Sequence, residues 1–292
     1  MNIGDVIRSL RPSQWTKNLF VFAALIFARK VFDGPLFLST LGAFAVFCLL
    51  SGSIYLVNDV LDYEEDRVHP KKSRRPIAAG RIGRGAAAGT AVFFAAVSLG
   101  GALVLNTGLF IAGAIYFVLQ IAYSIKLKHV VILDVFIVAS GFVIRVVAGG
   151  LVIRVPLSSW LLICTTLLAL FIALSKRRHE LVLLEENASS HRPILKEYSA
   201  YLLDQMISVV TASTVIAYCL YTVSEDTIKK LGTSHLIYTT PFVLYGIFRY
   251  LYLVHKKGQG GSPEELILKD KPLALSVLLW IATAVGILYY FK

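Results

Sequence analysis

Long apolar runs separated by short polar segments dominate this chain. The runs cover residues 16–32, 36–57, 86–106, 108–124, 130–152, 157–175, 206–224, 235–254 and 272–291. Each run is close to the roughly 20 residues that an α-helix needs to cross the hydrocarbon core of a bilayer. The pattern therefore predicts an all-α polytopic membrane protein with nine transmembrane helices. A short helix on the membrane surface is expected within residues 1–14.

The composition agrees with this pattern. Of the 292 residues, 57% are hydrophobic and 16% are charged, whereas an ordinary soluble domain carries roughly 25% charged residues. No boundary divides the bundle, so residues 1–292 are predicted to form a single transmembrane domain. The first run is not followed by a small-residue cleavage site, and we expect no removable signal peptide. Cys48, Cys164 and Cys219 lie within apolar runs and are expected to be small buried residues.

Charge is unevenly divided between the two sides of the predicted bundle. The long polar loops at about 58–85, 176–205 and 255–271 share a side with the N-terminus and carry most of the 29 Lys and Arg residues. The positive-inside rule then places this side in the cytoplasm. We expect an integral protein of the cell (inner) membrane whose active-site cavity opens to the cytoplasm. The net charge of +11 points to anionic lipid or an anionic substrate, and a nucleic acid partner is not expected in so hydrophobic a chain.

Four oxygen-bearing side chains occur within nine residues at the end of the second apolar run: Asn58, Asp59, Asp62 and Asp66. If the helix continues past the run, Asn58, Asp62 and Asp66 recur every four residues and share one face. Such a face can hold Mg²⁺ while leaving positions for phosphate oxygens. The alternative is a solvated acidic helix end.

A basic segment follows these acids directly. Lys72, Arg74 and Arg75 lie in a loop bounded by Pro70 and Pro76, which cannot be helical throughout. The loop can fold back over the acids, and Arg side chains match the geometry of phosphate. Anionic lipid headgroups are the alternative partners of these bases. Acids that hold a cation beside bases that hold phosphate indicate an enzyme acting on a diphosphate.

Further charged residues lie inside or at the ends of apolar runs, where they usually face the protein interior. Lys17 is predicted to face phosphate with Asn18 as its hydrogen-bonding partner. Asp134 and Arg145 are about three turns apart on one helix face. Asp134 is a candidate ligand of a metal or substrate, and Arg145 either binds anions or braces backbone carbonyl groups. Among the bases at 176–178, one is expected to bind substrate, although a stop-transfer cluster is the alternative.

Several linked motifs resemble the UbiA superfamily of membrane prenyltransferases. They are N-D-x-x-D-x-x-x-D at 58–66 and Y-S-x-x-L-K at 123–128. Four others resemble more closely its decaprenyl-phosphate phosphoribosyltransferase branch: R-P-x-Q-W-x-K-N at 11–18, H-P-x-K-x-x-R-P-I-A-A-G at 69–80, L-D-V-F-x-x-A-x-G-F-x-x-R at 133–145 and K-R-R-H-E-L at 176–181. The superfamily's second acidic pair is represented only by Asp134, which favours the phosphoribosyl branch over a prenyl diphosphate donor.

The resemblance implies a UbiA-type bundle and a Mg²⁺-dependent pentosyltransferase. This enzyme would transfer 5-phosphoribose from 5-phosphoribosyl diphosphate to a membrane polyprenyl (decaprenyl) phosphate. Asn58, Asp59, Asp62 and Asp66 would hold the metal and the diphosphate, with Asp59, Asp62 and Asp134 as catalytic residues. The substrate-binding residues would be Lys17, Asn18, Lys72, Arg74, Arg75, Tyr123, Lys126, Arg145, Lys176 and Arg178. The resemblance also allows a homo-oligomer, and the oligomeric state is left open.

Two other functions compete with this interpretation. An aromatic prenyltransferase of the same superfamily would use a polyprenyl diphosphate and an aromatic acceptor. A transporter would carry paired, broken helices near the midplane of the membrane. The only hints of such breaks are Gly149, Gly150 and Pro156, which lie near the predicted outer side, whereas the candidate ligands gather at the cytoplasmic helix ends.

Overall fold

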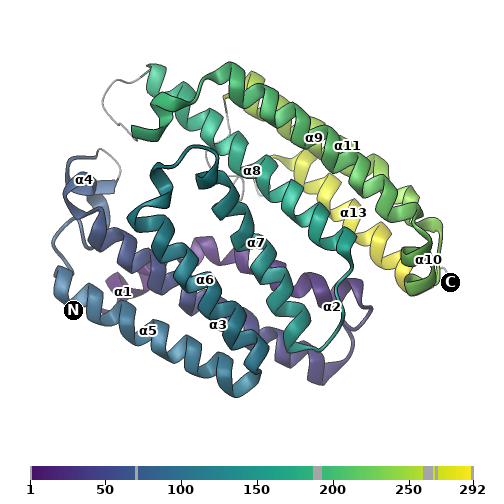
Figure 1. Ribbon diagram of the computed structural model, residues 1–292, viewed down its shortest axis with the longest axis horizontal. Coiled ribbons are helices and arrows are strands. Elements are labelled where there is room, and N and C mark those ends of the chain that lie inside the picture. Colours follow the sequence, from purple (N-terminus) through teal and green to yellow (C-terminus); the bar gives the residue numbers. More distant parts are fainter. Residues whose placement is uncertain (1, 70–71, 187–192, 259–265, 267–268, 291–292) are drawn as a thin grey trace. The chain divides into compact units, whose positions relative to one another are not determined.

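The protein is built from helices and their connections. A computed structural model describes residues 2–69, 72–186, 193–258, 266 and 269–290, and no strand occurs among them (Figure 1). The chain divides into two compact units, one formed by Met1–Ile137 and Gly141–Pro156 and the other by Val138–Ser140 and Leu157–Lys292. Pro70 and Lys71 of the predicted basic loop lie outside the described residues.

The first unit is organised around one long helix. Its elements are α1 (Ile3–Ser9), η1 (Pro12–Phe22), α2 (Ala23–Phe27), α3 (Gly34–Leu61), α4 (Tyr63–Val68), η2 (Lys72–Arg74), α5 (Arg84–Leu105), α6 (Thr107–Ile125), η3 (Leu127–His129) and α7 (Leu133–Val152), where η marks a 3₁₀ helix. α3 packs along α5, α6 and η1 (Figure 1). The C-terminal part of α3 is packed as well, because Leu56 is buried together with Ile77 and Ile82.

The second unit pairs its long helices along their length. It contains α8 (Ser159–Glu186), η4 (Pro193–Glu197), α9 (Ala200–Val223), α10 (Glu225–Leu231), η5 (His235–Thr239), α11 (Thr240–Lys257) and α13 (Lys271–Tyr290). α8 packs on α9, and α11 packs on α13. The Asp270 carboxylate accepts hydrogen bonds from Arg249 on α11 and caps the start of α13 through the backbone N–H of Leu273.

Seven described helices are long and apolar enough to cross a membrane: α3, α5, α6, α7, α8, α9 and α13. This number supports an integral membrane protein. The other two predicted spans take different forms. Residues 16–32 contain η1 and α2 in place of one regular helix, and residues 235–254 are covered by η5 and by α11, which carries Arg249, Lys256 and Lys257.

Two close contacts hold the N-terminal segment against the rest of the first unit. Leu10 is buried in an apolar cluster with Leu56 and Ile77. Further along, η1 approaches α7 so closely that a Cβ on Gly149 would lie 2.0 Å from the carbonyl oxygen of Val21. Only glycine fits such a backbone approach. These contacts fix both ends of the segment that contains Arg11, Lys17 and Asn18.

Candidate active site

The acidic motif lies where α3 ends and α4 begins. Asp59 is in the last turn of α3 and Asp66 is on α4, and their side chains are 2% and 1% exposed. Asp62 joins the two helices with φ −89° and ψ 15°, so one continuous helix does not run through the motif. Because α3 ends before Asp62, the three acids do not share one set of basic partners. Asp59 and Asp66 share a partner, whereas Asp62 has a different one.

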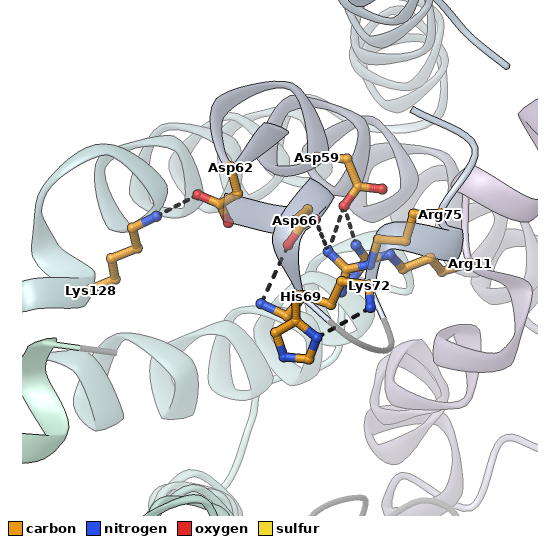
Figure 2. A network of polar contacts seen from close by, with 8 residues as sticks. All are labelled: Arg11, Asp59, Asp62, Asp66, His69, Lys72, Arg75 and Lys128. Atoms are coloured by element: carbon orange, nitrogen blue, oxygen red, sulfur yellow. Dashed lines mark hydrogen bonds and ion pairs between the residues drawn. The ribbon is translucent and has the colours of Figure 1, made fainter. Parts of the chain in front are cut away.

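Basic side chains from two distant segments surround the buried pair (Figure 2). The Arg75 Nη1 donates to Asp59 Oδ1 at 3.0 Å and to Asp66 Oδ2 at 2.6 Å. Arg11 also donates to Asp59 Oδ1, and the Lys72 Nζ lies 3.5 Å from Asp66 Oδ1. The prediction that the basic loop folds back over the acids is consistent with this geometry for Lys72 and Arg75.

Asp62 forms a separate ion pair beside this network. Its Oδ1 accepts from the Lys128 Nζ of η3 at 2.8 Å (Figure 2). The Asp62 side chain is 27% exposed and that of Lys128 is 18% exposed. The acidic motif is therefore in contact with bases from three parts of the first unit: the segment before η1, the loop after α4, and η3.

Burying two carboxylates would be costly without these cations, because each charge loses its hydration. Even so, the Oδ1 atoms of Asn58 and Asp66 are buried and accept no hydrogen bond from the described residues. A buried oxygen that accepts no hydrogen bond, such as Asn58 Oδ1, suits a hard cation when carboxylates lie beside it, and Mg²⁺ at phosphate substrates commonly takes only one or two carboxylates. The donor set thus fits Mg²⁺ bound together with a diphosphate. Within the described ranges, no three Asp, Glu, His or Cys residues gather into a metal-binding group by themselves.

Arg145 and Asn18 form a second polar network inside the first unit. The Arg145 Nε donates to Asn18 Oδ1 at 2.7 Å, Nη1 to the Gly141 carbonyl at 2.7 Å and Nη2 to the Tyr116 hydroxyl at 2.8 Å. Asn18 is fully buried and also donates to Ser51 Oγ at 3.3 Å. Because its donor atoms serve protein groups that tie η1, α6 and α7 together, the geometry favours the bracing role of Arg145 over anion binding.

The other predicted site residues of the first unit differ in burial. The Lys17 Nζ donates to Gln14 Oε1 at 2.6 Å. Asp134 is fully buried in the first turn of α7. Tyr123 is half-buried, whereas the side chains of Arg74 and Lys126 are exposed. Roles of these five residues in substrate binding or catalysis stay predictions.

The predicted bases of the second unit lie near the C-terminal part of α8. Arg178 donates through Nε to Asp204 Oδ1 of α9 at 2.5 Å, and Lys176 is exposed. His255 Nδ1 lies 3.8 Å from the same carboxylate. Burial, and after it the nearby Arg178 guanidinium, lowers the pKa of His255. Asp204 therefore has Arg178 as its main cationic partner at neutral pH.

Arg11 and Lys128 contact the acidic motif but were not among the predicted site residues. Arg11 is the first residue of the R-P-x-Q-W-x-K-N motif, and Lys128 is the last residue of Y-S-x-x-L-K. Both therefore belong to motifs that carry the family resemblance. The sequence alone offers no reason to prefer these two bases over the others, because only the folded chain shows which base reaches which carboxylate.

Comparisons with known proteins agree with these observations. Residues 18–268 match the model of the UbiA prenyltransferase family. The decaprenyl-phosphate phosphoribosyltransferase of Mycolicibacterium smegmatis is 37% identical over 99% of this chain and 93% of that protein. The enzyme of the same name from Mycobacterium tuberculosis is 36% identical over 96% of this chain and 93% of its own length, and the one from Corynebacterium glutamicum is 36% identical over 99% and 88%.

Solved structures with the same fold are more distant in sequence. A UbiA homolog from Archaeoglobus fulgidus bound to DMAPP and Mg²⁺ superimposes with a TM-score of 0.72 at 19% identity, covering 98% of this chain and 100% of that one. A homolog from Aeropyrum pernix K1 gives a TM-score of 0.62 at 15% identity, covering 98% of each chain. The similarity extends over nearly the whole length in both cases.

Proposed function

This chain belongs to the UbiA prenyltransferase family, and on that premise we propose that it transfers 5-phosphoribose from 5-phosphoribosyl diphosphate to a membrane polyprenyl phosphate. Diphosphate is the second product. The observation that carries the proposal is the centre in which Arg11, Lys72 and Arg75 converge on Asp59 and Asp66. Such a centre suits a diphosphate leaving group, and the similar enzymes from mycobacteria and Corynebacterium support the choice of donor and acceptor.

Mg²⁺ is the metal that we propose for this centre. Asp59 and Asp66 would hold it, with Asn58 and Asp62 completing the set predicted from the sequence. A bound Mg²⁺ supplies charge stabilisation to the departing diphosphate. The Asn58 Oδ1 supports this assignment, because a buried acceptor without a hydrogen-bonding partner is costly unless something binds it. The Asp66 Oδ1 accepts no hydrogen bond from the described residues and faces the Lys72 ammonium at 3.5 Å.

The basic residues have their own tasks in the proposed reaction. The bond between ribose C1 and the diphosphate oxygen breaks, and its electron pair leaves with the diphosphate. An oxygen of the acceptor phosphate forms the new bond to C1. Arg75, Lys72 and Arg11 would bind and orient the phosphate oxygens and stabilise their developing charge. The acceptor phosphate is already an anion at neutral pH, so the reaction needs no strong general base.

The proposed reaction also implies the side of the membrane from which each substrate would enter. The polar donor comes from the cytoplasm, and the polyprenyl chain stays in the bilayer with its phosphate at the cytoplasmic side. We accordingly propose that the N-terminus and the acidic motif face the cytoplasm, as the distribution of Lys and Arg predicts. A nine-helix bundle with a cytoplasmic cavity is part of this proposal.

A labelling experiment tests the function directly. Purified protein is mixed with Mg²⁺, a polyprenyl phosphate and phosphoribosyl diphosphate labelled in the ribose, and the organic phase is counted with and without EDTA. We expect label in the lipid fraction that disappears with EDTA and returns when Mg²⁺ is added in excess. A folded protein that labels none of several polyprenyl phosphates, yet prenylates an aromatic acid from a polyprenyl diphosphate, would establish the alternative function.

A further inference from the structure

Two separate segments of the first unit supply the bases that contact the buried acids. Arg11 follows α1 closely, whereas Lys72 and Arg75 belong to the segment after α4, and both segments reach the acids (Figure 2). In the proposed reaction, the metal and the diphosphate would take over the contacts that these bases make with Asp59 and Asp66. The two segments would then have to be held by contacts that do not involve the acids.

Arg81 forms such a contact between the two segments. Its Nε donates to the Asp5 carboxylate of α1 at 3.0 Å, and its Nη2 donates to the Arg74 carbonyl oxygen at 3.1 Å. Because a guanidinium is planar and holds its donors in a fixed arrangement, the two bonds also fix Asp5 relative to Arg74. The first bond is to the helix that precedes Arg11, and the second is to the peptide group that joins Arg74 to Arg75.

The chain that leads to Arg81 is a compact turn. The backbone N–H of Arg81 donates to the Pro76 carbonyl oxygen at 2.9 Å. Gly80 adopts a φ of 74°, a conformation that glycine reaches without strain. Ile77, within the turn, is fully buried in the apolar cluster that also contains Leu10. The turn is therefore held by backbone hydrogen bonds and apolar packing, and both are independent of the acids.

We propose that Arg81 is a positioning residue of the active site, which holds the two basic segments in place relative to each other. The inference rests on the proposed function, because it assigns Arg81 to the binding of the donor diphosphate. Without Arg81, a smaller fraction of the protein has both segments in place, and the apparent affinity for the donor falls by that fraction. A donor that has bound orders the bases itself and reacts at the normal rate.

Two substitutions remove the contact and a third is its control. Arg81→Gln removes the charge and the fork of donors, and Asp5→Asn removes the charge of the acceptor. The double variant should match Arg81→Gln, because the bond to Asp5 is already lost in that protein. Arg84→Gln is the control: the Arg84 side chain is 56% exposed, against 40% for Arg81, and lies 3.8 Å from Glu64 of α4.

Hydrogen exchange of the backbone amides measures the contact without any substrate. In Arg81→Gln, the amides of residues 72–75 should exchange about fivefold faster than in the unmodified protein, the size expected for one exposed ion pair together with one hydrogen bond. Asp5→Asn should show a smaller increase in the same amides, because the bond to the Arg74 carbonyl oxygen remains. Arg84→Gln should leave their exchange unchanged.

Two further measurements connect the contact to the donor. Arg81→Gln should weaken the binding of inorganic diphosphate with Mg²⁺, measured by calorimetry, about fivefold, and it should raise the KM for phosphoribosyl diphosphate by the same factor. The kcat and the KM for polyprenyl phosphate should stay within about twofold of the unmodified protein. A loss of folded protein would instead lower kcat and leave the KM for the donor unchanged.

The outcomes separate this inference from the proposed function. If Arg81→Gln matched Arg84→Gln in amide exchange or in diphosphate affinity, the role of Arg81 would be overturned, whether or not the unmodified protein transfers phosphoribose. A lower kcat with an unchanged donor KM would overturn it as well. An unmodified protein that binds diphosphate but transfers no phosphoribose would contradict the proposed function, and the calorimetry would still decide the role of Arg81.

Discussion

Asp59 and Asp66 remain buried in the first unit because arginine and lysine side chains lie directly against them. Removal of one partner from a buried ion pair leaves an uncompensated charge and costs about 3–5 kcal/mol. Arg75 contacts both carboxylates through one nitrogen. Its replacement by Ala should therefore affect both folding stability and donor binding. A residue that forms a single, partly exposed ion pair is a better probe of function alone.

Lys128 and Lys126 offer such a comparison. The Lys128 Nζ lies 2.8 Å from Asp62, whereas Lys126 is exposed. We expect Lys128→Ala to lower kcat/KM for phosphoribosyl diphosphate at least about tenfold, because a hydrogen bond involving a charged group contributes about 1.5–3 kcal/mol. Lys126→Ala should change it by less than about twofold. Steady-state kinetics with both variants checks this, and the reverse order would favour the assignment made from the sequence.

At the scale of single residues, the sequence indicated candidate residues but not the partners of each. The spacing of Asn58, Asp59, Asp62 and Asp66 indicated a cation site, and the basic loop indicated phosphate. The spacing did not predict that the helix would end at Leu61, so that Asp62 pairs with Lys128 and not with the bases around Asp66. Local periodicity cannot show which distant segment supplies a counter-charge, because that depends on tertiary packing.

The element that carries most of the N-terminal motif is η1. Hydropathy alone predicts a regular span over residues 16–32, but the segment forms η1 and then the short helix α2. Its Asn18 side chain binds Arg145 inside the protein, and its backbone packs against Gly149 of α7. An apolar run indicates that a segment is buried or in lipid, but it does not indicate whether the backbone is a continuous α-helix.

The contact between η1 and α7 can be tested by adding one methyl group. Gly149→Ala places a Cβ 2.0 Å from the Val21 carbonyl oxygen, so the backbone of one element must move. We expect a loss of about 1–3 kcal/mol, as in other overpacked sites. Thermal unfolding in detergent should show a lower Tm.

Gly100→Ala is the control for this substitution, because its Cβ meets nothing within 4 Å. It should leave Tm unchanged or raise it, since Ala is favoured over Gly in a helix interior by roughly 0.5–1 kcal/mol. Equal Tm values for Gly149→Ala and the unmodified protein would show that η1 and α7 do not approach each other so closely.

For the whole molecule, the sequence predicted a helical membrane protein, and the seven apolar helices together with the family membership confirm that class. The sidedness rests on charge alone. Lys and Arg gather in the loops expected to be cytoplasmic, and a positive loop is costly to translocate. This prediction can be tested in intact cells.

Cysteine labelling tests the orientation. In a background where Cys48, Cys164 and Cys219 are replaced by Ala, single cysteines are introduced at Glu65 and at Lys229, both of which are exposed. A membrane-impermeant maleimide applied to intact cells should label the Lys229→Cys protein. The Glu65→Cys protein should react only after the membrane is permeabilised. The opposite pattern would place the acidic motif outside the cell and contradict entry of the donor from the cytoplasm.

The central claim is that a metal-dependent phosphoribosyl transfer takes place at the buried acids. The most direct measurement compares Asp66→Asn with Glu65→Gln, its exposed neighbour on α4. Each variant is assayed for transfer of labelled phosphoribose to polyprenyl phosphate and for Mn²⁺ binding by electron paramagnetic resonance.

We predict that Asp66→Asn lowers the transfer rate at least about 100-fold, because it removes a carboxylate that would hold the Mg²⁺ stabilising the departing diphosphate. Its Mn²⁺ binding in the presence of diphosphate should weaken in parallel, while Glu65→Gln keeps both properties. A folded Asp66→Asn protein with near-normal transfer and metal binding would contradict the account.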